Sequence, residues 1–118
     1  MWSPDVDIAE LEARADDVAR LLSLIANPKR LLILCRLAQG EASVGQIRDA
    51  VGLGQSALSQ HLAKLRGAGI VATRRAAQTI HYRIADRETE AVMASLYEIF
   101  CAGQPGRAPG RQVTSSRP

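Results

Sequence analysis

The sequence predicts a mainly α-helical domain with one small β-hairpin, in the order ααααββα. Three observations lead to this fold class. Apolar residues recur with helical spacing through most of residues 7–101, a stretch near residue 80 switches to the alternation of a strand, and aromatic residues make up only 3% of the chain. Leu, Ile, Val and Ala must therefore fill the core, a mixture more typical of packed helices than of an all-β domain.

Length and composition exclude several classes of protein. A chain of 118 residues with 47% hydrophobic and 23% charged residues fits one globular domain and is too short for a two-domain enzyme. Its longest apolar run, residues 31–35, is far shorter than the ~20 residues that cross a bilayer, and its acid-rich start lacks the apolar segment of a secretory signal. We expect a cytoplasmic protein with reduced cysteines, a domain over residues 7–101, and tails at 1–6 and 102–118, the latter disordered.

The first two predicted helices lie on either side of Asn27-Pro28. Residues 7–26 place an apolar side chain alternately every three and four positions, a seam that can pack within the chain or against a second copy. Asn27 can cap a helix and Pro28 fits a first turn, so a second helix is expected over residues 28–39. Because apolar residues nearly encircle this second helix, we place it in the middle of the core.

Two short helices joined by a tight turn come next. Gly40 ends the preceding helix, Ser43 can cap a helix over residues 43–51, and Gly52-Leu53-Gly54 leads into a helix over residues 55–66. This arrangement is a helix-turn-helix. Beyond it, residues 70–75 and 80–84 predict a β-hairpin with its tip at residues 76–78, and a last helix is expected from Asp86 to about Cys101.

The helix over residues 55–66 combines an apolar inner face with a polar and basic outer face. Leu58, Leu62 and Leu65 face inward at helical spacing. The residues predicted to contact DNA from this helix are Gln55, Ser56, Ser59, Gln60 and Lys64. Gln and Ser can hydrogen-bond base edges or phosphates, and Lys can neutralise a phosphate.

The net charge of +3 is unevenly distributed. No Asp or Glu occurs between Asp49 and Asp86, whereas the hairpin within this window carries Arg74, Arg75 and Arg83. These arginines are predicted to hold the DNA backbone or minor groove beside the helix. The basic window and the helix-turn-helix together favour binding to double-stranded DNA over an ordinary solvated surface.

These residues resemble the arsenical-resistance repressor (ArsR) family of dimeric winged-helix transcription factors. The similarity covers about residues 18–101. It is carried by Asn27-Pro28 with Arg30-Leu31-Leu32-Ile33-Leu34, by Gln55-Ser56-Ala57-Leu58-Ser59-Gln60-His61-Leu62, by Ala68-Gly69-Ile70-Val71 and by Tyr82-Arg83-Ile84. The resemblance implies a winged helix-turn-helix homodimer, joined through the first and last helices, with recognition helices in successive major grooves of a palindrome. Where the family usually has a glycine at the wing tip, this chain has Ala76-Ala77.

The metal ligands usual in the family are missing from the matching positions. Residues 41–47 contain no cysteine, no histidine follows His81, and His61 and His81 are expected to pack or lie near DNA. Cys35 and Cys101 remain, a pattern similar to the sulfide-responsive, biofilm-growth-associated branch of the family, which senses persulfides or related oxidants with a dithiol. The resemblance implies a repressor, without metal or cofactor, that binds its operator when reduced and releases it when the two cysteines are linked.

Other interpretations of the same residues stay open at this point. The two thiols can be inert core residues, because cysteine is often buried, or they can form a metal- or metalloid-responsive site. A regulator that binds only protein is a third possibility. An enzyme is not expected, because the chain has no Gly-rich phosphate loop and no nucleophile with an oriented base.

Overall fold

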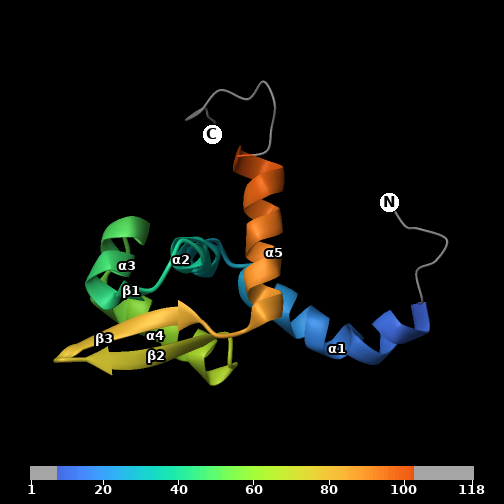
Figure 1. Cartoon of the computed structure of the whole chain (residues 1–118), viewed down its shortest axis with the longest axis horizontal. Helices are drawn as coiled ribbons and strands as arrows, with labels where there is room; N and C mark the ends of the chain where they lie inside the picture. Colours follow the sequence, from blue (N-terminus) through green and yellow to red (C-terminus); the bar gives the residue numbers. More distant parts are fainter. Residues whose placement is uncertain (1–7, 103–118) are drawn as a thin grey trace.

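The computed structural model describes residues 8–102 and has the predicted order of helices and strands (Figure 1). The predicted tails, apart from residue 102, and residue 7 lie outside the described residues. The elements are α1 (Ile8–Ile25), α2 (Pro28–Ala38), β1 (Ala42–Ser43), α3 (Val44–Val51), α4 (Gln55–Gly67), β2 (Val71–Ala76), β3 (Thr79–Ile84), α5 (Arg87–Tyr97) and a terminal π-helical turn (Glu98–Ala102). No helix among residues 8–102 is both long enough and apolar enough to cross a bilayer.

Side-chain caps fix where three of the helices begin, as the sequence predicts. The Asn27 carboxamide oxygen accepts hydrogen bonds from the backbone N–H groups of the first turn of α2, at 3.0 and 3.1 Å. Ser43 and Gln46 form a reciprocal capping box at the start of α3. The Asp86 carboxylate accepts from both the backbone N–H and the hydroxyl of Thr89, at 2.9 and 2.6 Å, so the fully buried Thr89 has a partner.

The β-hairpin is part of a three-stranded antiparallel sheet with strand order β1-β3-β2. The sequence prediction missed β1, whose two residues pair with Tyr82 and His81 of β3. The predicted three-residue tip is also corrected, because Ala76 pairs with Thr79 and leaves a two-residue turn. In that turn Ala77 adopts a left-handed conformation, with φ of +57°, where the family's glycine would be unstrained.

The core forms where α2, α3 and α4 meet the inner side of the sheet. Leu58, Leu62 and Leu65 of α4 are buried, which confirms its predicted inner face, and Ile33, Leu34 and Leu37 anchor α2. On the last helix the buried apolar residue is Met93. Ile99 and Phe100, predicted on the apolar face of that helix, are 52% and 59% exposed.

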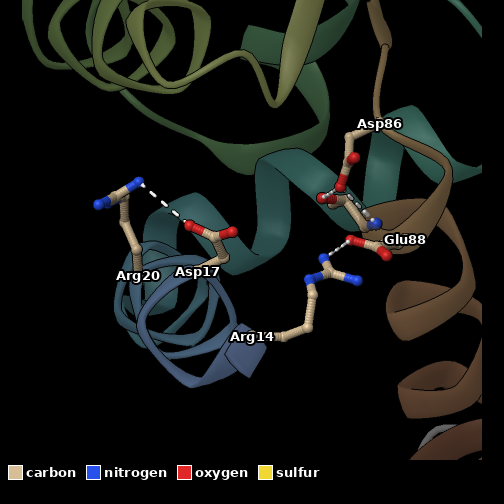
Figure 2. Close-up of polar contacts among 6 residues, drawn as sticks. Arg14, Asp17, Arg20, Asp86 and Glu88 are labelled. Carbon is tan, nitrogen blue, oxygen red and sulfur yellow. Dashed lines mark hydrogen bonds and ion pairs between the residues drawn. The ribbon is translucent and has the colours of Figure 1, made fainter. Parts of the chain in front are cut away.

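Helix α2 occupies the centre of the arrangement. It packs against α1, α3, α5 and β3, while the hairpin and α1 extend to opposite sides (Figure 1). One polar contact ties α1 to α5: the Arg14 guanidinium donates to the Glu88 carboxylate at 2.9 Å (Figure 2). The DNA-binding elements predicted from the sequence are thus connected through α2 to both terminal helices.

Candidate nucleic-acid interface and thiol pair

Helix α4 presents the predicted polar face to solvent. Gln55, Ser56, Ser59, Gln60 and Lys64 are all exposed. The face is held in place from behind, because Leu58 and Leu65 are fully buried on the opposite side of the helix. The structure therefore brings together five side chains that can hydrogen-bond bases or neutralise phosphate, on one rigid element.

The sequence prediction missed Arg48, an exposed residue in the last turn of α3. Its guanidinium donates to the carboxamide oxygen of Gln55 at 2.8 Å, which links the two helices across the turn. Gln55 keeps its amide N–H groups available as donors. The sequence prediction omitted Arg48 because it lies beside Asp49, just outside the window without acidic residues. Its place in the last turn of α3, the first helix of the helix-turn-helix, could have indicated it.

The arginines of the wing differ in what they contact. Arg75 and Arg83 are exposed on β2 and β3. Arg74 instead forms an ion pair with Glu41, in which its Nη2 lies 2.7 Å from Oε1 and its Nε lies 2.9 and 2.8 Å from the two carboxylate oxygens. This contact lowers the pKa of Glu41. The stretch of sequence without acidic residues therefore has an acidic neighbour in the folded protein, because folding places Glu41 against the wing.

Cys35 lies half-buried on α2, in a groove of about 600 Å³ between α2 and α5. The groove is lined by Cys35, Ala38, Gln39, Glu90, Met93, Ala94, Tyr97 and Glu98. Cys101 is exposed in the π-helical turn that continues α5. Burial raises the pKa of the Cys35 thiol, and the negative charge of a Cys101 thiolate raises it further. The two cysteines, 66 positions apart in the sequence, thus lie on α2 and on the turn that continues α5, and α2 packs against α5.

Among residues 8–102, neither histidine joins a metal-binding group. His61 and His81 are half-buried on α4 and β3, and His81 pairs with Ser43 and Arg74 in the sheet. Within residues 8–102 no three His, Cys, Asp or Glu side chains are grouped to hold one ion. Two thiolates without a third ligand make a poor closed metal site.

Comparison with known proteins gives consistent matches. The model of the bacterial regulatory protein arsR family matches residues 27–73. The biofilm growth-associated repressor of Xylella fastidiosa strain 9a5c is 42% identical over 84% of this chain and 87% of its own length. The crystal structure of the repressor BigR from the same species superposes with a TM-score of 0.77 at 42% identity, over 82% of this chain and 99% of that one.

Two further relatives bear on regulation and assembly. The transcriptional activator HlyU of Vibrio cholerae is 42% identical over 81% of this chain and 89% of its own. A winged helix-turn-helix DNA-binding domain from Mycobacterium bovis, described as homodimeric and as a possible ArsR-family regulator, has a TM-score of 0.66 at 34% identity, over 83% and 89% of the two chains. The fold is therefore a winged helix-turn-helix.

Proposed function

Since the chain belongs to the arsR family of bacterial regulatory proteins, we propose that it is a homodimeric, cytoplasmic repressor controlled by its two thiols. In its reduced form it binds a palindromic DNA operator, and it releases the operator when Cys35 and Cys101 are linked by a persulfide or another oxidant. One observation carries the proposal: α2, which holds Cys35, packs against α5, which leads to Cys101, and against α3, the first helix of the helix-turn-helix.

The DNA contacts are assigned to the exposed face of α4 and to the wing. Gln55, Ser56, Ser59 and Gln60 read base edges or hold phosphates in the major groove, and Lys64 neutralises a phosphate. Arg75 and Arg83 contact the neighbouring DNA backbone. Arg74 can do so only if its ion pair with Glu41 breaks. Arg48 supports this surface by fixing the Gln55 carboxamide.

The dimer is assigned to the apolar surfaces of the terminal helices. Ile8, Leu11 and Leu22 of α1 are 60%, 41% and 50% exposed, and Tyr97, Ile99 and Phe100 at the end of α5 are more than half exposed. Large apolar side chains exposed on the surface are typical of a protein interface. The relative from Mycobacterium bovis is described as homodimeric, which supports a dimer.

The burial of the two thiols suggests an order for the chemistry. Cys101 is exposed and attacks first, whereas Cys35 is half-buried and its raised pKa leaves less thiolate near neutral pH. The Cys101 thiolate attacks the outer, sulfane sulfur of a hydropersulfide, RSSH, and a thiol RSH leaves. The Cys35 thiolate then attacks the inner sulfur of the Cys101 persulfide, which forms a disulfide and releases H₂S. The two thiols lose two electrons and the sulfane sulfur gains them. Further persulfide would lengthen the bridge to a polysulfide.

The test compares reduced protein with protein treated with glutathione persulfide, by fluorescence anisotropy on a duplex from the promoter of its own gene and by intact mass. We expect binding by the reduced protein, loss of binding after treatment, and a mass that shows a bridge. Cys35→Ser and Cys101→Ser should bind DNA like the wild type but stay bound after treatment. If Cys101→Ser still loses DNA, the bridge is not the switch.

The sign of regulation needs its own measurement, because one relative is named a repressor and another an activator. Transcription from the same promoter, reconstituted with RNA polymerase, should fall when reduced protein is added. It should recover when the protein is treated with persulfide. A rise on adding the reduced protein would assign activation instead.

A further inference from the structure

The Glu41 carboxylate, beside the sheet of the wing, binds Arg74, an arginine that could otherwise contact DNA. Glu41 precedes β1, and Arg74 lies on β2, at the other edge of the sheet. Three N–O distances of 2.7 to 2.9 Å join the Arg74 guanidinium to the two oxygens of Glu41. This is the two-pronged geometry with which arginine also binds phosphate.

The strand register shows what surrounds this ion pair. Ser43, His81 and Arg74 lie directly opposite one another across β1, β3 and β2, so they share one face of the sheet. Arg83, two residues from His81 on β3, lies on the same face. Arg74, His81 and Arg83 all act to lower the pKa of Glu41. One carboxylate therefore faces three basic side chains on a surface that the proposed function places beside DNA.

We infer that Glu41 limits the affinity of the protein for DNA by occupying Arg74 in place of a backbone phosphate. The inference rests on the DNA binding proposed above and deepens it. While the ion pair lasts, the Arg74 charge is cancelled and its donors are used. If Arg74 turns to a phosphate, the unpaired Glu41 carboxylate remains close by and repels the same backbone. In either case the pair adds little net positive charge to the interface.

The size of the effect follows from counterion release. Each phosphate neutralised on B-form DNA steepens the slope of log K against log salt by about 0.9. If the Arg74 contact contributes nothing at 1 M salt, freeing it tightens binding about eightfold at 0.1 M and about twofold at 0.4 M, for each protomer bound. Because phosphates are the same in every duplex, the gain is expected on operator and on unrelated DNA alike.

The experiment measures the affinity of reduced, full-length protein for operator and scrambled duplexes between 0.1 and 0.4 M salt. Glu41→Gln removes the negative charge but keeps the shape of the side chain. Arg74→Gln removes the captured cation. Arg75→Gln is the control, because it removes an exposed arginine at the next position of the same strand, on the opposite face of the sheet, for which the described residues show no ion-pair partner.

We expect Glu41→Gln to bind both duplexes more tightly with a slope steeper by about 0.9 per bound protomer. The double variant Glu41→Gln/Arg74→Gln should stay within about twofold of wild type, because it removes both charges of the pair. Arg74→Gln alone leaves the Glu41 carboxylate unpaired and should weaken binding, and Arg75→Gln should weaken binding and flatten the slope. A change of stability alone would not alter a salt slope, so thermal melting of each variant separates folding from binding. If Glu41→Gln does not fold, Glu41→Ala removes the same carboxylate and makes the same test.

Two results would overturn the inference while leaving DNA binding in place. One is a Glu41→Gln protein with wild-type affinity and slope. The other is a Glu41→Gln/Arg74→Gln protein that binds DNA as tightly as Glu41→Gln, because the gain would then not come from freeing Arg74. If instead the wild type shows no salt-dependent binding to any duplex, the proposed function itself fails, and the inference fails with it.

Discussion

Linking Cys35 to Cys101 should make the folded protein markedly more stable. A bridge between residues 66 positions apart closes a long loop in the unfolded chain, and the loss of its entropy corresponds to about 4 kcal/mol at 25 °C. Strain in the native state reduces this gain. Because α2 already packs against α5, we expect at least about 2 kcal/mol to remain.

Urea unfolding of reduced and bridged protein at one fixed protein concentration measures this gain, with intact mass recorded for every sample. Fixed concentration matters because the folding of a dimer depends on it. Cys101→Ser, treated in the same way, is the control and should unfold at the same urea concentration before and after treatment. A bridged wild-type protein whose stability rises by less than about 1 kcal/mol would refute the reasoning. The link would then be forming only at the expense of native packing.

Three smaller predictions test single features of the structure. The rate at which iodoacetamide modifies Cys35 should reach half its maximum at a higher pH than for an ordinary thiol. Cys101→Ser should shift that midpoint only partly downward, because burial is the larger cause of the raised pKa. A midpoint that does not move in Cys101→Ser would contradict the proximity of the thiols. Leu22→Glu on the exposed seam of α1 should dissociate the dimer in light scattering, whereas Ile80→Glu on the wing should not. Ala77→Gly should stabilise the protein by about 0.5 kcal/mol in thermal unfolding, since relief of the positive φ exceeds the added chain entropy, and a lower melting temperature would argue against strain at the wing tip.

Features that depend on local chemistry could be predicted from the sequence. Asn27, Ser43 and Asp86 cap helices because their short polar side chains reach backbone N–H groups two or three residues away. The inner face of α4 was predictable for the same kind of reason, since leucines spaced three and four apart can face the core only if the segment is helical. The face proposed to contact DNA then follows as the opposite side of the same helix.

Features that depend on contacts between distant segments could not be predicted. Strand β1 has only two residues and exists because β3 pairs with it. The Glu41–Arg74 ion pair joins residues 33 positions apart, and no local pattern indicates it. Periodicity also cannot distinguish an apolar face that packs on the chain's own core from one that is left for a second copy. Met93 and Phe100 lie on the same terminal segment, yet only Met93 is buried.

Helix α2 gives the proposed switch a physical route from the thiols to DNA. It carries Cys35 and packs against both α5 and α3, so a bridge that moves α2 relative to α5 must also alter the packing behind the helix-turn-helix. Coupling of this kind is reciprocal: if the bridge weakens DNA binding by some factor, DNA must disfavour the bridge by the same factor.

This reciprocity predicts a shift in redox potential. For a two-electron couple, each tenfold loss of DNA affinity per bridged protomer should raise the reduction potential of the Cys35–Cys101 disulfide by about 30 mV when operator is saturating, so a tenfold loss for a dimer with two bridges corresponds to about 15 mV. Equilibration in glutathione buffers, with and without operator, followed by acid quenching and mass measurement, gives both potentials. A scrambled duplex is the control and should shift the potential less. If operator leaves the potential unchanged although the bridged protein binds DNA more weakly, the loss of binding comes from some other oxidation product and not from the bridge.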